Sequence, residues 1–437
     1  MNKTVLLSFV LLALLGVAAC GLILGHGDIA PIAKPAMESF DRALVKRGES
    51  LAVIGGCQTC HTKTGGRPFA GGLPLDTPFG AIHSTNITPD VGTGIGAWSE
   101  AAFIRAMREG VDRNGRHLYP AFPYDYYAKV TDSDLKAIYA FLMTRPAVAQ
   151  KPSDNDLAFP FNLRPLLAGW KLLFHRSGEF QPDTSRDGEW NRGAYLVEGL
   201  GHCGACHSPR NFLGAASKIG PNAYGGGVAE GWWAPPLNAT SPVAIPWTTK
   251  SLVNYLIDGW DGDHGIAAGP MTSVVNGLKD QSEDDVFAIA AYLMSLKGGP
   301  LPQPSQDKFQ AEARALADKL EWGHPEAPPL PKDPVLLKGA AVFESQCATC
   351  HKAGGATVPL ALTTMVNGPD AANLIAVSFH GIQPPRGALS RSMPGRASQI
   401  SDQDMTALAQ FIRARFSQQP AWHGIEQPVR LARKGGH

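Results

Sequence analysis

The hydrophobic pattern of the chain begins with one long apolar stretch. After Lys3, the residues from Val5 to Leu24 are apolar except for Ser8 and a few glycines. A run of about 20 such residues is long enough to cross the hydrocarbon core of a membrane as a helix. Three interpretations remain open: an uncleaved membrane anchor, a lipoprotein signal modified at Cys20, and a cleaved signal peptide. All three predict that the rest of the chain is exported.

A different pattern then occurs three times along the chain. A Ser or Thr is followed by acidic residues, and apolar residues then recur at spacings of three and four. The first residue is a good N-cap, the acids complement the helix dipole, and the spacing places the apolar side chains on one face. The pattern predicts three equivalent helices, at Thr131–Leu142, Ser282–Leu293 and Ser401–Ile412.

Two further features precede each of these helices in the same order. A basic residue followed by glycine opens an earlier helical stretch, at Arg47-Gly48, Arg192-Gly193 and Lys338-Gly339. A middle helix then ends in glycine, which is favoured just past a helix, at Gly110, Gly259 and Gly381. The chain therefore contains three copies of one helical unit.

The repeats set the predicted domain boundaries. The segments are 1–37 (signal or anchor, with a linker), 38–148 (first unit), 149–189 (connector), 190–298 (second unit), 299–334 (Pro-rich linker), 335–418 (third unit) and 419–437 (tail). Strand signals are few, and 48 glycines and 35 prolines indicate irregular loops between short helices. We therefore predict an all-α fold.

Composition narrows the function classes. The 437 residues are 44% hydrophobic and 18% charged, as expected for a globular protein of several domains. The net charge is +1, and the chain has no basic stripe of the kind that binds nucleic acid. A nucleic-acid-binding function is therefore excluded.

The cysteines carry the chemical signal. Of the 7 cysteines, all but Cys20 fall in three Cys-x-x-Cys pairs, and a histidine directly follows each pair. The motifs are Cys57-Gln-Thr-Cys60-His61, Cys203-Gly-Ala-Cys206-His207 and Cys347-Ala-Thr-Cys350-His351. This is the attachment signal for c-type haem, in which two thiols bind the porphyrin and the histidine binds its iron.

Zinc sites, redox pairs and disulfides account for the three pairs less well. A zinc site with four cysteines would use two pairs and leave the third over. A thioredoxin-like redox pair needs a βαβ context that the sequence lacks, and structural disulfides do not require a histidine after every pair. We therefore predict three covalently bound haem c groups, in three tandem cytochrome c-type domains.

The repeats also locate ligands for the opposite side of each iron. At the same distance beyond Gly259 and Gly381 lie Met271 and Met393, each next to a proline in a predicted loop. A methionine opposite histidine raises the reduction potential of a haem. The methionines at helical positions are instead expected to fill the core; they are Met107, Met143, Met294 and Met405.

The first unit breaks this rule, because the corresponding residue is Phe122, whose side chain cannot bind iron. We expect His117, in the same loop, to be the substitute ligand of haem 1. The alternatives are an open or weakly liganded site, Met107, or His83, with His117 then bonded to the backbone or to a haem propionate. We expect haem 1 to differ spectroscopically from the other two and to have a lower potential.

The connector contains an apolar segment of its own. From Phe159 to Phe174 it includes Trp170 and two leucine pairs, and we predict a helix at Phe161–Phe174. This segment is a candidate contact with a membrane, a quinone or a partner protein. The alternative is a helix that covers core surface between domains.

The exported part of the chain resembles the triheme cytochrome c subunits of bacterial membrane-bound dehydrogenases for alcohol, gluconate or aldehydes. The resemblance is strongest in Ser84–Asp90, in Leu118–Tyr124 and in Arg192–His207. In the alcohol branch the second of these segments has a methionine where this chain has Phe122. The chain is therefore more similar to cytochromes that accompany molybdopterin and iron–sulphur hydroxylases acting on aldehydes or nicotinate.

The resemblance implies an electron-transfer subunit. Its partners would be a dehydrogenase catalytic subunit, an iron–sulphur subunit and ubiquinone or another respiratory acceptor, and its location the periplasmic face of the inner membrane, anchored by the N-terminus. It also implies covalent cysteines and proximal histidines in all three motifs, with distal methionines at Met271 and Met393.

Two further functions remain open. An open haem 1 would allow a peroxidase-like enzyme, and a chain without a dedicated partner would be a free-standing periplasmic electron shuttle. The sequence has no glycine-rich nucleotide loop and no nucleophile motif, so we expect no catalytic residues of its own.

Overall fold

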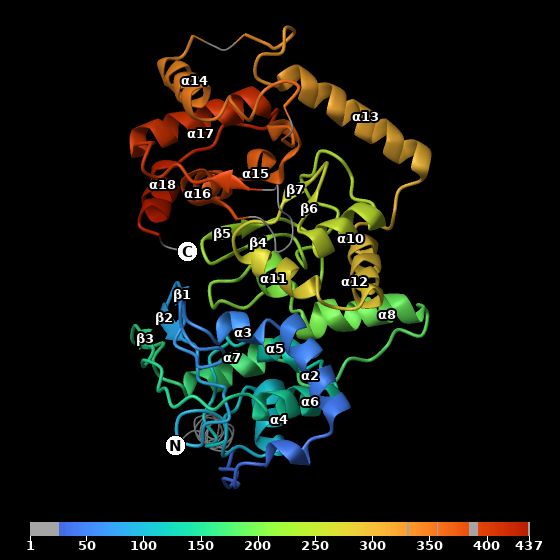
Figure 1. The fold of residues 1–437 in the computed structure, drawn as a ribbon, viewed down its shortest axis with the longest axis vertical. Helices are drawn as coiled ribbons and strands as arrows, with labels where there is room; N and C mark the ends of the chain where they lie inside the picture. The colour runs from blue at the N-terminus through green and yellow to red at the C-terminus, as the bar shows by residue number, and fades with distance from the viewer. Residues whose placement is uncertain (1–25, 330–331, 356, 384–391, 436–437) are drawn as a thin grey trace, which may run out of the picture. The chain divides into compact units, whose positions relative to one another are not determined.

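The structure is a computed structural model that describes residues 26–329, 332–355, 357–383 and 392–435 (Figure 1). The described residues form two compact units. Unit 1 comprises the described part of Met1–Asp183 together with Tyr195–His202 and Phe212–Ala215. Unit 2 comprises Thr184–Ala194, Cys203–Asn211 and the described part of Ala216–His437. The finer division into three repeat domains stays a prediction.

Helices make up most of the regular structure. In unit 1 they are η1 (Met37–Ser39), α2 (Arg42–Ile54), α3 (Cys57–Cys60), α4 (Glu100–Glu109), α5 (Tyr124–Tyr127), α6 (Asp132–Met143), α7 (Leu166–Phe174) and the π-helix η2 (Leu196–Leu200). The remaining helices are α8 (Gly188–Tyr195), α9 (Gly204–His207), α10 (Thr249–Asp258), α11 (Pro270–Leu278), α12 (Glu283–Ser295), α13 (Gln303–Leu320), α14 (Pro334–Gln346), η3 (Leu360–Leu362), α15 (Thr364–Asn367), α16 (Ala372–His380), α17 (Asp402–Phe416) and α18 (Glu426–Arg433).

The expectation of an all-α fold is wrong, because 44% of the structure is helical and several antiparallel sheets accompany the helices. Unit 1 has a three-stranded sheet of β1 (Pro74–Thr77), β2 (Gly80–His83) and β3 (Asp156–Leu157). Unit 2 has three two-stranded ladders, formed by β4 (Gly227–Ala229) with β5 (Trp232–Ala234), β6 (Trp260–Asp261) with β7 (Gly265–Ile266), and β8 (Gly381–Ile382) with β9 (Met393–Pro394). These strands have two to four residues each, too few for the alternating pattern by which a strand is recognised in a sequence.

The three terminal helices of the repeats are confirmed. They are α6, α12 and α17, and their N-caps are Thr131, Ser282 and Ser401. In each case the N-cap side chain accepts a hydrogen bond from the backbone N–H three residues later. The acidic residues fill the first turn, where the helix dipole favours negative charge.

The recurring glycine of the first helix marks a close helix crossing. A Cβ atom added at Gly48 of α2 would lie 1.9 Å from the carbonyl oxygen of Ala137 in α6. The corresponding distance is 1.9 Å for Gly193, facing α12, and 2.2 Å for Gly339 of α14, facing α17. In Figure 1, α14 accordingly lies alongside α17. Only glycine permits this approach of two backbones.

The basic residue before each glycine pairs with the first turn of the same terminal helix. The acceptor is in each case the aspartate three residues after the N-cap. The pairs and their shortest described N–O distances to that aspartate are Arg47–Asp134 (2.5 Å), Arg192–Asp285 (2.7 Å) and Lys338–Asp404 (2.9 Å). The sequence repeat therefore encodes one helix crossing, formed three times.

The middle helices α4, α10 and α16 end at the predicted glycines. Gly110, Gly259 and Gly381 have positive φ values of 62°, 75° and 78°. This conformation is easy for glycine and costly for other residues. It turns the chain into the loop that follows each middle helix.

The segment after the third repeat belongs to a hydrophobic core. Trp422, Ile425 and Val429 are buried in one cluster with Phe343 and Phe411 of α14 and α17. The helix α18 lies within this segment, which is the predicted tail 419–437. Its apolar residues are spaced for one buried face.

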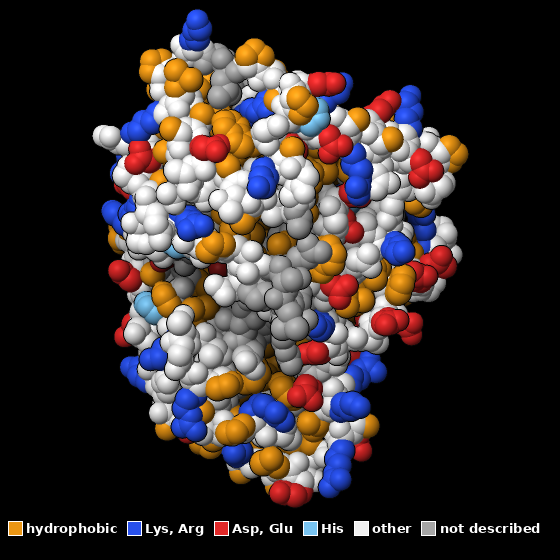
Figure 2. Space-filling view, turned by 45° about the horizontal axis from the view of Figure 1, so that its top comes forward, with side chains coloured by type: hydrophobic (Ala, Val, Ile, Leu, Met, Phe, Trp, Pro, Cys, Tyr) orange, Lys and Arg blue, Asp and Glu red, His pale blue; other side chains and the backbone are white. Residues whose placement is uncertain are grey.

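Neither the surface charges nor the apolar helices of the described residues indicate a nucleic-acid-binding surface or a membrane-spanning helix. Figure 2 shows positive and negative side chains interspersed on the viewed face, as the net charge of +1 leads one to expect. Among the described residues, no helix has both the length and the apolar composition required to cross a membrane. The predicted anchor at residues 5–24, with Cys20, lies outside the described part of the chain.

Candidate functional site

The three Cys-x-x-Cys-His motifs form the same backbone turn. The first motif contains α3, the second contains α9, and the third directly follows α14. In each motif the histidine N–H donates to the carbonyl of the first cysteine over 3.0 Å. Residues three apart on such a turn lie on one side of it. Both sulphur atoms of a motif are therefore placed to react with a single group.

Burial keeps the leading thiol of each motif protonated. It raises the pKa of Cys57 and of Cys203 to about 12 and that of Cys347 to about 11. None of the described cysteines forms a disulfide. A thioredoxin-like redox pair depends instead on a thiol whose pKa is lowered. The arrangement therefore disfavours a dithiol redox site.

The motif histidines have the form that binds a metal. Burial lowers the pKa of His61, His207 and His351, so their imidazoles are neutral. The Nδ1 atom of His61 donates to the Thr85 carbonyl over 2.6 Å, and that of His207 donates to the Pro235 carbonyl over 2.7 Å. Since Nδ1 carries the proton, Nε2 keeps a lone pair for a metal ion.

In the third motif, no described carbonyl orients the histidine ring. The Nδ1 atom of His351 is buried and has no hydrogen-bond partner among the described residues. Two thiols, a neutral imidazole and an oriented ring nonetheless fit c-type haem at the first two motifs. The described residues contain no group of three or more His, Cys, Asp or Glu side chains that could hold a separate metal ion.

The predicted distal methionines lie in short regular elements rather than loops. Met271 is in the first turn of α11 and Met393 is in β9, and both are half-buried. Their binding to iron stays a prediction. The methionines expected in the core are indeed buried within helices; they are Met107, Met143, Met294 and Met405.

Phe122 lies one side chain away from the first motif. Its ring centroid is 5.5 Å from that of Tyr127. The Tyr127 hydroxyl donates to the Gly55 carbonyl over 3.1 Å, just before the motif. Burial raises the pKa of Tyr127, and the nearby thiols of Cys57 and Cys60 add to the effect. An aromatic ring that cannot bind iron therefore lies near the first motif.

His117 is held by a lysine that the sequence did not indicate. Lys171 of α7 donates from Nζ to the carbonyls of Glu109 and Gly110, over 2.7 and 2.6 Å, and to Nδ1 of His117 over 3.0 Å. An ammonium group has three hydrogens, and these three acceptors use all of them. Because Nδ1 of His117 accepts, the proton of its neutral ring is on Nε2.

This tautomer sets a condition on iron binding by His117. The side chain is 5% exposed, and its Nε2 atom has no partner among the described residues. Burial, together with Lys171 and His26, lowers the pKa of His117 to about 4. Binding of iron through Nε2 would require the bond from Lys171 to be lost. Iron binding by His117 therefore stays a prediction.

Met107 and His83, the further candidate ligands of haem 1, lie in different elements. Met107 is buried in α4, with 5% of its surface exposed. His83 ends β2, and its backbone N–H donates to the Asn155 side chain over 3.0 Å. Iron binding by Met107 or by His83 stays a prediction, and so does a haem 1 without a sixth ligand.

The site also includes two backbone carbonyls that sequence reasoning missed. Thr85 and Pro235 orient His61 and His207. Thr85 lies within Ser84–Asp90, one of the segments that carry the family resemblance. A carbonyl carries no residue-specific signal, so neither role could be found from the sequence.

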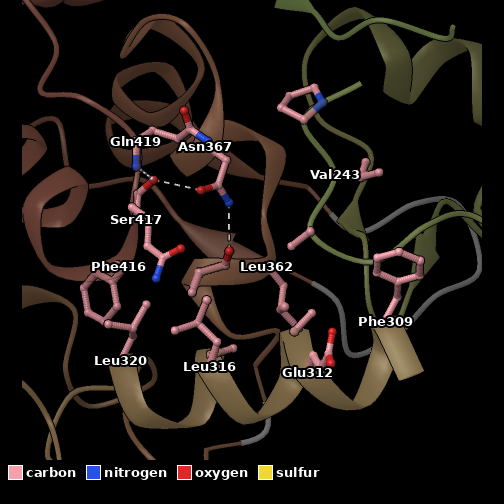
Figure 3. A pocket seen from close by; sticks show the side chains of 16 residues that line it. Val243, Phe309, Glu312, Leu316, Leu320, Leu362, Asn367, Phe416, Ser417 and Gln419 are labelled. Atoms are coloured by element: carbon pink, nitrogen blue, oxygen red, sulfur yellow. Dashed lines mark hydrogen bonds between the residues drawn. The ribbon is translucent and has the colours of Figure 1, made fainter. Parts of the chain in front are cut away.

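A separate cavity lies away from the motifs in unit 2. Its volume is about 440 Å³, and apolar side chains of α13, including Phe309 and Leu316, face polar side chains of the third repeat (Figure 3). The amide of Asn367 is satisfied there, because it donates to the Ala361 carbonyl over 2.8 Å and accepts from Ser417 over 2.8 Å. No motif residue lines this cavity.

Comparisons with known proteins agree with the motif chemistry. Residues 334–412 match the protein family described as "Cytochrome C oxidase, cbb3-type, subunit III". The chain is 45% identical to a nicotinate dehydrogenase subunit of Pseudomonas putida over 92% of its own length, but it spans only 33% of that relative.

Two relatives of similar length match almost throughout. The gluconate 2-dehydrogenase cytochrome c subunit of Pantoea cypripedii is 39% identical over 90% of this chain and 89% of the relative. The cytochrome c subunit of the quinone alcohol dehydrogenase of Gluconobacter oxydans is 37% identical over 86% of this chain and 79% of the relative. The chain therefore belongs to the family of dehydrogenase cytochrome c subunits, which are electron-transfer proteins with covalently bound haem c.

Proposed function

We propose that this chain carries three haem c groups and passes electrons from a partner dehydrogenase to ubiquinone or another respiratory acceptor. The observation that supports three haems is the repetition of one geometry, because the same 3.0 Å turn hydrogen bond closes all three motifs. When bound, each group supplies an iron that changes its charge by one electron.

The residues of the chain have distinct roles in this proposal. The cysteine pairs at 57 and 60, 203 and 206, and 347 and 350 form thioether bonds. His61, His207 and His351 bind the irons through Nε2, and the Thr85 and Pro235 carbonyls hold the first two rings in orientation. Met271 and Met393 would supply sulphur ligands to the second and third irons.

Haem 1 is proposed to differ from the other two, because Phe122 replaces the methionine. Its sixth ligand is His117 only if the ring changes tautomer and gives up the bond from Lys171. While the hydrogen bond from Lys171 is intact, His117 does not bind the iron of haem 1. In both cases haem 1 lacks a methionine at the position of Met271 and Met393, and we propose that it has the lowest potential of the three.

The partner is proposed to be a dehydrogenase catalytic subunit with an iron–sulphur subunit. Support comes from the match to the nicotinate dehydrogenase subunit and from Phe122, which separates this chain from the pattern of the alcohol branch. The proposed location is the periplasmic face of the inner membrane, with the N-terminus as an anchor.

The haem count is tested by mass spectrometry of the denatured protein and by its pyridine haemochrome absorbance. We expect three added haems that survive acid–acetone extraction. The double variant Cys203→Ala/Cys206→Ala should lose about one third of the absorbance. Fewer than three haems in the unaltered protein, or pigment released by the extraction, would contradict the proposal.

A peroxidase-like activity is the second candidate, and Phe122 is the observation that favours it. If no side chain takes the place of the methionine, the sixth position of haem 1 is available to a small ligand. Rapid turnover of peroxide by the reduced protein would support this activity. Reduction of a ubiquinone analogue without peroxide turnover supports electron transfer alone.

A further inference from the structure

An exposed apolar surface surrounds the helix α7 in unit 1. We call it the connector patch. It consists of Phe159, Phe161, Leu163, Leu166, Leu172, Leu173 and Phe212. Exposure reaches 78% for Phe159 and 86% for Phe212. Single exposed apolar residues are common, but a contiguous group of this kind marks a binding surface.

The helix α7 begins later than the sequence predicts, and it is apolar on both faces. Its N-cap is Pro165. A proline disfavours helical backbone in the residue before it, so the helix does not extend back to Arg164. One face is fixed to unit 1, where Trp170 Nε1 donates to the Leu213 carbonyl over 3.0 Å and Lys171 binds the end of α4.

The opposite face of α7 is apolar and exposed. Leu166, Leu172 and Leu173 are 55%, 66% and 60% exposed. A helix that is hydrophobic all round is normally buried on every side. The interpretation that α7 only covers core surface therefore accounts for one of its faces and leaves the other without a partner among the described residues.

The patch extends beyond the helix as a connected surface. The hydrogen bond from Trp170 to Leu213 places the segment of Phe212 next to α7. On the other side of the patch, the Phe161 ring lies 4.5 Å from that of Phe79, which is next to β2. Aromatic and leucine side chains thus contribute together to this surface of unit 1.

The connector segment itself carries formal charges of one sign. Between Leu157 and Gly178 the sequence contains Arg164, Lys171 and Arg176 and no Asp or Glu. The Arg176 side chain is exposed at the end of α7. Apolar anchors with aromatic residues and flanking cations are the composition of segments that lie in the interface of an anionic bilayer.

We propose that the connector patch binds the surface of an anionic lipid bilayer, with α7 lying parallel to it. The helix has 9 residues, far fewer than the roughly 20 needed to cross a bilayer, so it lies at the interface. The proposal relies on the proposed membrane location. It does not depend on the number of haems.

The test uses the full-length, haem-loaded protein together with its co-purified dehydrogenase subunits. The complex is placed in vesicles of phosphatidylcholine and phosphatidylglycerol that carry a photoactivatable acyl chain, and the labelled peptides are identified by mass spectrometry. We expect lipid adducts on peptides covering 159–174 and 212, in addition to any on the N-terminal segment. Adducts confined to the N-terminal segment would overturn the proposal, because a partner protein would then cover the patch.

A pair of matched variants sharpens the result. Leu172→Asn/Leu173→Asn changes two exposed side chains and should lower lipid labelling of the connector several-fold. The control Leu337→Asn/Leu431→Asn changes two comparably exposed leucines of α14 and α18 and should leave it unchanged. Equal labelling in both variants would contradict the proposal.

The charge contribution is tested separately with Arg176→Gln. We expect this variant to lose part of the preference for phosphatidylglycerol over phosphatidylcholine vesicles. An unchanged preference would overturn the choice of an anionic surface. The haem spectra should remain normal in all these variants. Loss of lipid labelling with normal haem spectra therefore concerns the connector patch, whereas missing haem would contradict the proposed function.

Discussion

The first and second repeats follow the same backbone path after their middle helices. The helix α4 ends at Gly110 in the first repeat, and α10 ends at Gly259 in the second. The N–H of Leu118 donates to the Gly110 carbonyl over 2.8 Å, and that of Ala267 donates to the Gly259 carbonyl over 2.8 Å. An antiparallel pairing stands between these points in each repeat, at Val111 with His117 and in β6 with β7.

The side chains on this shared backbone differ where iron chemistry is expected. The first repeat has His117 and Phe122 at the positions that Ile266 and Met271 occupy in the second. The connector adds Lys171, which binds both the end of α4 and the His117 ring. The repeat therefore fixes the backbone of this loop, while two or three side chains differ at the positions where ligands of iron are predicted.

The largest expected effect comes from exchanging the residues at the methionine position. Phe122→Met should add a sulphur ligand to haem 1 and raise its potential by something on the order of 0.1 V, within the roughly 0.8 V range that axial ligands cover. Met271→Phe should lower the potential of haem 2 by a similar amount. A redox titration followed optically measures both. Unchanged potentials in the two variants would remove this position from the ligand set.

The shared helix crossing is expected to respond strongly and equally in all repeats. Gly48→Ala places a methyl group against the Ala137 carbonyl, so we expect a loss of about 2 kcal/mol in the free energy of unfolding. Gly193→Ala and Gly339→Ala should cost similar amounts. Denaturant unfolding followed by circular dichroism measures the loss. The control Gly169→Ala, where nothing lies within 4 Å, should not destabilise the protein.

Lys171 of the connector offers a more selective test of how the first repeat differs from the second. Lys171→Met removes the donor to His117 Nδ1, so the ring can take the opposite tautomer and offer Nε2 to iron. We expect the optical and spin-state spectra of haem 1 to change toward two nitrogen ligands. In the double variant Lys171→Met/His117→Ala this change should be absent. If His117→Ala alone already alters the haem 1 spectra as a lost ligand would, His117 binds iron in the unaltered protein.

A smaller effect is expected from acid. Because burial lowers the pKa of His117 from 6.5 to about 4, the unfolded chain binds the proton more readily between these values. The stability contributed by the neutral ring is therefore present above pH 6.5 and is lost as the pH falls toward 4. His117→Gln should flatten this part of the stability profile, measured by denaturant midpoints from about pH 4 to about pH 7. A profile unchanged by the substitution would contradict the lowered pKa.

Much of the helical framework and the motifs could be predicted from the sequence. The N-caps Thr131, Ser282 and Ser401 and the glycines at the ends of the middle helices act within one turn of chain, so a local pattern contains the information. The short strands escaped prediction because each has only two to four residues, too few for an alternating pattern, and because a pairing such as that of β6 with β7 depends on the tertiary structure. The fold class was wrong for that reason.

The site shows the same division. The amino-acid order alone places the thiols and the imidazole of each motif together, because their spacing fits one turn of chain. The folded chain was needed to show that the Thr85 and Pro235 carbonyls orient His61 and His207 and that Lys171 sets the tautomer of His117. These contacts join residues 24 to 54 positions apart, and no local pattern specifies which distant group a folded chain will bring into hydrogen-bonding distance.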